Sequence, residues 1–235
     1  MLRNCTKILL STGALVIAVP LNAAIIRFEA DLTRAQEPPP GNALPTLTSL
    51  GAPRPVSFRK GVFFLNTDNP LAPFMTMTIV VNNIDVGRVG GAIPIGATAA
   101  GGGTQTPSDS NDDLVAAHIH VGPGVPGVSN SPVRWGFWGA PFNNTDNDGV
   151  MTPFGIGAGG TYTGEWDALE GNGAGINLIS QMADIIAERA YVNFHTGQFG
   201  GGEIRGQLLK VPEPATLALL GLGLLGLARL RRKSA

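Results

Sequence analysis

The sequence has one cysteine in 235 residues, Cys5, and it lies in an amino-terminal segment that we expect to be removed. The remaining domain then has no disulfide and no thiolate ligand for a metal. Charge is also scarce: only 14% of the residues are charged, and residues 25–210 hold 10 basic and 16 acidic side chains, a net charge of −6. A domain this acidic lacks the basic surface that nucleic-acid binding requires, and we therefore expect no nucleic-acid partner.

The composition favours a fold of short strands. Glycine (33 residues) and proline (18 residues) are frequent, which indicates many turns and argues against a helical bundle. Alternating or β-branched segments predict strands at 26–32, 62–65, 74–81, 114–121, 191–195 and 203–209. One amphipathic helix is predicted at about 177–189. We therefore expect a mostly β domain, a single β-sandwich or Greek-key barrel-like structure, over residues 25–209.

The amino terminus has the organisation of a secretory signal. Arg3 and Lys7 precede a twelve-residue apolar run, Ile8 to Val19, and small residues follow at Ala23 and Ala24. This order of basic, apolar and small residues is typical of signal peptides, and the run is short for a membrane span. We expect a signal helix over residues 1–23 that signal peptidase removes; a buried helix is the alternative.

The carboxyl terminus, residues 211–235, combines a proline-bounded start, an apolar helix and a basic end. The apolar stretch, Ala215 to Ala228, holds 14 residues, so as a helix it is about 21 Å long against roughly 30 Å of hydrocarbon. This order resembles the PEP-CTERM sorting signal, with its motif at Pro212, Glu213 and Pro214 and its basic residues at Arg229, Arg231 and Arg232. A plain membrane anchor and an apolar core helix are the alternatives.

The resemblance to the PEP-CTERM signal implies a route for the protein. The family belongs to Gram-negative bacteria that make extracellular polysaccharide, and an exosortase-type transpeptidase is thought to recognise and cut the tail. It implies transient anchoring in the inner membrane, followed by placement at the cell surface or in the extracellular matrix.

Four segments of the central domain resemble the CHRD (chordin-type) domain. They are Phe28–Leu32 with Gln36–Pro39, Ala117–Gly122, Tyr191–Thr196 with Asn193, and Gly202–Leu208 with Glu203, Arg205 and Gln207. The resemblance implies an extracellular β domain with no established enzymatic activity. It gives no ligand, so an extracellular polysaccharide or a protein remains open as a partner. A glycine-rich segment at 87–113 departs from the family pattern, and we expect it to be a flexible loop.

The three histidines of the chain all lie within these motifs. His118 and His120 are two residues apart on a predicted strand and therefore share a face. His195 lies on another predicted strand. If the strands are neighbours, three imidazoles can hold zinc or copper; otherwise the rings bond to nearby carbonyls or carboxylates and have a structural role.

Other polar and aromatic groups have plainer explanations. Glu203, Arg205 and Gln207 share a strand face and are expected to pair across strands. Residues 144–149 imitate the start of a calcium loop, although an Asp-Gly hairpin turn explains them better. Glycosidase carboxylates could be supplied by Glu165, Asp167 and Glu170, but the sequence does not fix their separation. The aromatic side chains of Trp135, Phe137 and Trp138 could stack on sugars but are expected in the core.

These observations lead to two functional hypotheses. The first is a non-enzymatic surface or matrix module. Hydrolase activity is disfavoured because the domain has neither a Gly-x-Ser-x-Gly elbow nor a cysteine nucleophile. The second is an extracellular zinc or copper domain that uses the three histidines.

Overall fold

The computed structural model describes residues 25–87, 93–94, 109–146, 148–154, 158–212 and 223. The predicted signal segment, nearly all of the carboxyl-terminal tail and most of the glycine-rich segment lie outside these residues. Within them, no helix is both long and apolar enough to cross a membrane.

Strands dominate the described chain. They are β1 (Ile25–Thr33), β2 (Phe58–Asn66), β3 (Phe74–Asn82), β4 (Ile93–Pro94), β5 (Leu114–Val121), β6 (Val133–Trp138), β7 (Val150–Pro153), β8 (Gly159–Asp167), β9 (Ala190–Thr196), β10 (Ile204–Gln207) and β11 (Leu209–Lys210). One 3-10 turn, η1 (Arg34–Gln36), and one helix, α1 (Leu178–Ile186), complete the elements. The expected fold class, mostly β with one short helix, is confirmed.

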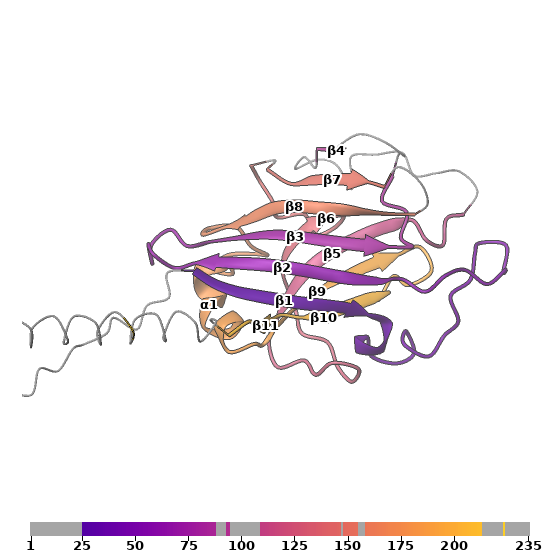
Figure 1. The fold of residues 1–235 in the computed structure, drawn as a ribbon, viewed down its shortest axis with the longest axis horizontal. Helices are drawn as coiled ribbons and strands as arrows, with labels where there is room; N and C mark the ends of the chain where they lie inside the picture. Colours follow the sequence, from indigo (N-terminus) through magenta and orange to yellow (C-terminus); the bar gives the residue numbers. More distant parts are fainter. Residues whose placement is uncertain are drawn as a thin grey trace, which may run out of the picture.

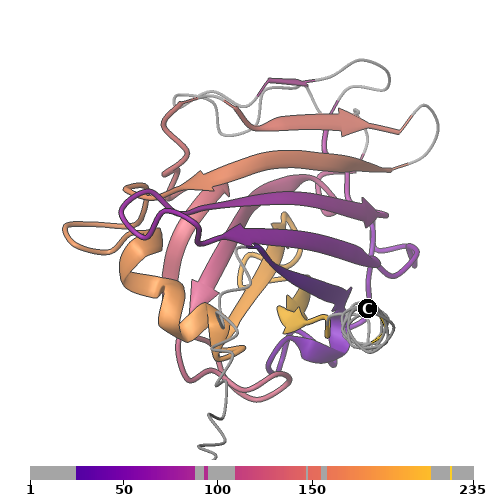
Figure 2. The same ribbon diagram turned by 60° about the vertical axis from the view of Figure 1, so that its left-hand side comes forward.

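The strands form one antiparallel sheet that curls on itself. Its order is β4-β7-β8-β3-β2-β1-β10-β9-β5-β6, and β11 pairs with β1. Figure 1 shows β1, β2, β3 and β8 as one layer, with β5, β9 and β10 behind them. In Figure 2 the strands β5 and β6 cross the first layer steeply. The sheet is a half-barrel whose concave side encloses the core.

Alternating apolar residues explain this core. In β3 the side chains of Met75, Met77, Ile79 and Val81 are buried while their neighbours are not, because successive side chains of a strand point to opposite faces. The curl brings together strands that are distant in the sheet order. Trp135 of β6 stacks on Trp166 of β8, with ring centroids 5.6 Å apart.

The helix α1 follows the predicted amphipathic pattern but is shorter than residues 177–189. Asn177 is its N-cap: the Asn177 side chain accepts from the Ser180 backbone, and the Ser180 hydroxyl accepts from the Asn177 backbone. Leu178 and Ile185 point into the core. The helix lies at one end of the curled sheet (Figures 1 and 2).

The strands β5 and β9 are covered on both faces. Every residue of β9 is buried, and in β5 only Val115 is exposed. Their apolar face, which includes Ile119 and Phe194, belongs to the core. Their other face is polar and lies beneath loops. The buried polar side chains on it form the candidate site.

Two sequence interpretations were wrong at the level of the fold. The strands β4, β6, β7 and β8 were not predicted: glycines interrupt the alternation in β6 and β8, and β4 and β7 are only two and four residues long. The expected hairpin at 144–149 is also absent: β6 pairs with β5 and β7 pairs with β4 and β8, so this connection runs from the edge strand β6 to the second strand from the opposite edge of the described sheet.

Candidate metal centre

The sheet brings the three histidines together, which fulfils the condition for a metal site. His118 and His120 lie on β5, and β5 pairs directly with β9, which carries His195. In the register, Ala116 lies opposite His195, His118 opposite Asn193, and His120 opposite Tyr191. All these side chains lie on one face at alternate positions, so the histidines come from a compact patch of two neighbouring strands.

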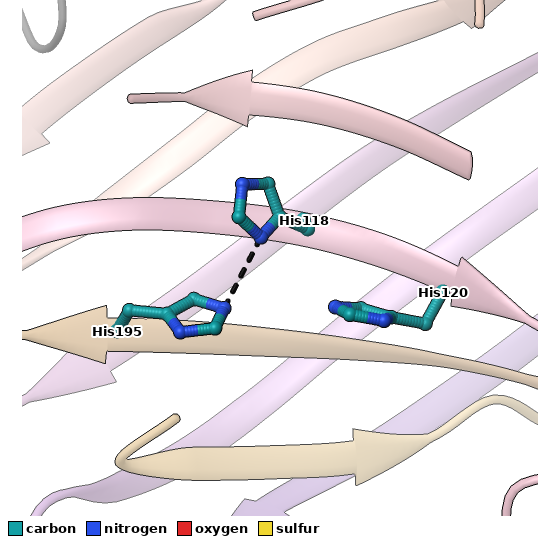
Figure 3. Close-up of side chains that lie close together, drawn as sticks. All are labelled: His118, His120 and His195. Atoms are coloured by element: carbon teal, nitrogen blue, oxygen red, sulfur yellow. Dashed lines mark hydrogen bonds between the residues drawn. The ribbon is translucent and has the colours of Figure 1, made fainter. Parts of the chain in front are cut away.

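The imidazole nitrogens of the three rings converge. One ring nitrogen from each histidine lies within 4.8 Å of the others. His118 Nδ1 is 3.1 Å from His195 Nε2, and Figure 3 shows the His120 ring directed toward this pair. The residues are only 4%, 6% and 8% exposed for His118, His120 and His195 respectively. The cluster is therefore well shielded from bulk water.

Each ring uses its other nitrogen to bind a backbone carbonyl. His118 Nε2 lies 3.1 Å from the Ala140 carbonyl oxygen, His120 Nδ1 lies 2.7 Å from that of Ser131, and His195 Nδ1 lies 3.0 Å from that of Gly200. A carbonyl only accepts, so these three ring nitrogens carry the proton. The hydrogen-bond network thus assigns the tautomers and leaves His118 Nδ1, His120 Nε2 and His195 Nε2 as lone-pair donors that face one another.

Burial keeps the three rings neutral. Desolvation, and then the neighbouring His195 and His120 rings, lower the pKa of His118 to about 3. Desolvation lowers the pKa of His120 to about 4 and also lowers the pKa of His195. Neutral imidazole is the form that binds zinc, copper and nickel, so the site offers three unprotonated nitrogens at neutral pH.

Neighbouring aromatic and cationic groups fix the rings. Tyr191 stacks on His120 with ring centroids 4.6 Å apart, and the Arg205 guanidinium lies 3.4 Å from the centroid of the Tyr191 ring. Arg205 Nη1 also donates to the Ser129 carbonyl oxygen at 2.9 Å. This stack limits the rotation of His120 and holds the loop after β5 against the sheet.

A glycine permits one of the three carbonyl contacts. Gly136 of β6 lies opposite His118 in the register. A Cβ at Gly136 would lie 1.8 Å from the carbonyl oxygen of Pro141. The loop that carries Ala140 can therefore approach His118 only because residue 136 has no side chain.

A buried carboxylate lies beside the cluster. Glu37 is 1% exposed, and desolvation raises its pKa to about 7, although Arg205 and the Asn193 amide lower it in part. Neither of its carboxylate oxygens has a hydrogen bond of ordinary geometry within the described residues. A Cβ at Gly202 would lie only 2.6 Å from Glu37 Oε1, so the chain passes directly over this carboxylate.

The expected pairing across strands was wrong for Glu203, which precedes β10 and pairs with a loop residue. Glu203 is buried and binds Arg54 of a loop at 2.6 Å, together with the hydroxyls of Ser57 and Thr196. Arg205 is buried on Tyr191, as described above, and Gln207 donates to the Glu188 carbonyl oxygen. These residues hold loops over the polar face. A buried charge is costly unless it is paired or hydrogen-bonded, and here the loops supply the partners.

The acidic residues near residue 144 gather at a second place. One oxygen each of Asp146, Asp167 and Glu170 lies within 4.8 Å of the others. Glu170 is held by Trp135 Nε1 at 3.0 Å and by the backbone and hydroxyl of Thr145. Desolvation and then Asp167 raise the pKa of Glu165 to about 7. The buried Glu170 thus has a structural task beside the core.

The aromatic residues of β6 are core residues, as expected. Trp135 and Phe137 are fully buried and Trp138 is 1% exposed. They are therefore not available as a stacking surface for sugars.

The sequence left several parts of this site unrecognised. Asn193 and Glu37 were noted only as motif residues. The carbonyls of Ser131, Ala140 and Gly200 could not be predicted, because a pattern of side chains does not show where backbone oxygens point.

Of the sorting motif, Pro212 is described, whereas Glu213, Pro214 and the basic residues Arg229, Arg231 and Arg232 lie outside the described residues.

Comparison with family models assigns both parts of the chain. The CHRD domain model matches residues 28–208, and the PEP-CTERM protein-sorting motif matches residues 210–233. Comparisons with curated proteins and with solved structures gave no match. The sorting motif implies processing by an exosortase and an exported, surface-associated protein. The chain therefore belongs to the CHRD domain family and carries a C-terminal PEP-CTERM sorting motif.

Proposed function

We propose that this exported domain binds one zinc or copper ion through His118 Nδ1, His120 Nε2 and His195 Nε2. The observation that carries the proposal is the 3.1 Å contact between His118 Nδ1 and His195 Nε2. Both rings already give their proton to a carbonyl, so this contact places two lone pairs against each other. A cation between the nitrogens turns that repulsion into two bonds.

The spacing supports a metal ion of this size. Zinc binds imidazole nitrogen at about 2.0–2.1 Å, which puts two ligands of a tetrahedral ion about 3.3 Å apart. The observed 3.1 Å is close to this value. His120 Nε2 is buried and has no hydrogen-bond partner in the described part of the chain, so a third donor is available.

A purely structural role fits the contacts less well. It would require a second proton on one ring, and therefore an imidazolium charge inside a site where all three rings are buried. Burying a charge without a partner is costly, and within the described residues the cluster of His118, His120 and His195 includes no carboxylate that could pair with an imidazolium.

The support for a binding module over an enzyme comes from the rest of the domain. Its aromatic residues are in the core, and the buried Glu170 is engaged by Trp135 and Thr145. We therefore infer a non-enzymatic module that, after removal of the signal peptide and exosortase-type processing, stays at the cell surface or in the extracellular matrix. A polysaccharide or protein ligand there is compatible with this inference.

Metal analysis and calorimetry of the protein recovered after export test the proposal. One zinc or copper ion should bind per chain, and His120→Ala should abolish or strongly weaken binding. Thr163→Ala is the matched control, because Thr163 is exposed on β8, outside the histidine patch. Absence of binding to the native protein, or undiminished binding to His120→Ala, would contradict the proposed function.

A further inference from the structure

We propose that Asn193 Oδ1 is a fourth ligand of the same ion, and that Glu37 orients the Asn193 amide for this task. The proposal rests on the metal site proposed above and deepens it. It turns a site with an open position into one closed by four protein ligands.

Asn193 has the placement that a fourth ligand needs. It lies on β9 two residues before His195, so both side chains are on the polar face. It is also directly opposite His118 in the register of β5 and β9. Asn193 is 1% exposed, and its side chain reaches both His195 and His120. No ordering of a distant loop is required to bring it to the ion.

The contact of Asn193 with His195, like that between His118 and His195, brings two hydrogen-bond acceptors together. Asn193 Oδ1 lies 3.1 Å from His195 Nε2. Because His195 gives its proton to the Gly200 carbonyl through Nδ1, its Nε2 has no proton for the amide oxygen. Two acceptors therefore face each other here as well, and both repulsive contacts share His195 Nε2. A single cation beside that nitrogen removes both.

Glu37 supplies a reason for the amide orientation. Its buried carboxylate lies beside the Asn193 amide, and neither oxygen has a hydrogen bond of ordinary geometry within the described chain. A carboxylate accepts and an amide NH₂ donates, so Glu37 favours the orientation with Nδ2 toward itself and Oδ1 toward the histidines. Outer groups that orient ligands in this way typically change metal affinity by about 10–100-fold.

A closed site has a functional consequence. Catalytic zinc sites keep a position for water or substrate, whereas structural sites use four protein ligands. With Asn193 bound, the ion fastens β5 to β9 and has no open position. The amide oxygen is a hard ligand, so the set of three nitrogens and one oxygen favours zinc(II) or copper(II) over copper(I).

Cobalt(II) loading of the exported protein tests the fourth ligand. Three histidines and one water also make a four-coordinate site, but a metal-bound water ionises near neutral pH whereas an amide oxygen does not. The native protein should therefore show a visible cobalt spectrum that does not change between about pH 6 and pH 9. Asn193→Leu should admit water to the open position, so its spectrum should change with pH, and it should bind cobalt and zinc at least about 10-fold more weakly. Asn193→Asp, which keeps an oxygen ligand, should keep the pH-independent spectrum. Glu37→Leu should weaken binding by about 10-fold, with Thr163→Val as the control.

The outcomes separate this inference from the proposed function. If Asn193→Leu and Asn193→Asp both keep the native affinity and spectrum while His195→Ala binds no metal, the site has three ligands and Asn193 is not one of them. If the native protein binds no metal, both proposals are wrong. Thermal unfolding of each metal-free variant shows whether it is folded. If the leucine variant is not folded, the native protein decides, because a cobalt spectrum that changes with pH would show that water, and not Asn193, is the fourth ligand.

Discussion

His118 Nδ1 and His195 Nε2 lie 3.1 Å apart, although each ring already donates its proton to a backbone carbonyl. The two residues are 77 positions apart in the chain and meet because β5 and β9 are neighbours. Two buried lone pairs in contact are unfavourable in the metal-free protein, so the energetics of the domain should depend on the ion.

Metal should stabilise the fold by mass action. An ion that binds only the native state at 100 times its dissociation constant adds about 2.7 kcal/mol to the free energy of unfolding. We expect zinc or copper to raise the thermal midpoint of the exported protein and a chelator to reverse the shift. His195→Ala should show no shift with either ion, and an equal shift in that variant would place the binding elsewhere.

Acid should destabilise the metal-free domain through the histidines. The pKa of His118 falls from its ordinary value of 6.5 to about 3 in the folded protein, and that of His120 to about 4. The unfolded chain therefore binds more protons than the native one between about pH 6.5 and pH 3, so the stability falls as the pH decreases through this window.

Chemical unfolding with a chelator present, at several values between pH 8 and pH 4, measures this effect. Carboxylates also titrate in this range, so the slope must be compared with that of His118→Phe, which lacks one of the neutral rings. The variant should lose less stability on acidification. Equal slopes would show that His118 is not held neutral by the fold.

Gly136→Ala should damage both the loop and the site. The new Cβ would meet the Pro141 carbonyl oxygen, so the loop must move and take the Ala140 carbonyl away from His118. We expect a loss of about 1–3 kcal/mol in the free energy of unfolding and weaker metal binding. Gly201→Ala is the control, because a Cβ there meets no atom of the described chain within 4 Å. Native-like metal affinity in Gly136→Ala would mean that this carbonyl contact is dispensable.

The ion pair of Arg54 and Glu203 should matter far more than a surface pair. Its side chains are 4% and 0% exposed, and removing one partner leaves a buried charge. Arg54→Met should cost about 3–5 kcal/mol in denaturant unfolding. Arg27→Met breaks the exposed pair with Glu29 and should cost at most about 1 kcal/mol. Similar losses in both variants would contradict the structural task assigned to Arg54.

Processing should remove both ends of the chain. The sorting motif implies exosortase cleavage, and the first 23 residues have the pattern of a signal peptide. Mass spectrometry of the exported protein should find a start near Ala24 and no basic cluster at residues 229–233. An intact chain of 235 residues in the cytoplasm would contradict this route.

The sequence by itself determined what depends on local pattern. Alternation of apolar residues predicted β1, β3 and β5, since every second side chain of a strand faces the core. The 3.6-residue period predicted α1, and the spacing of His118 and His120 placed both on one face. The motifs were sufficient to indicate the CHRD domain and the sorting tail.

Only the tertiary structure decided what depends on pairing between distant segments. No local pattern shows that β5 and β9 are neighbours in the sheet. The glycine-containing strands β6 and β8 form because their partner strands and the aromatic core stabilise them. The tautomers of the histidines depend on three loop carbonyls, and the burial of Glu37 depends on the chain passing over it at Gly202. These are positions of backbone atoms in space, and the identities of side chains along the sequence do not determine them.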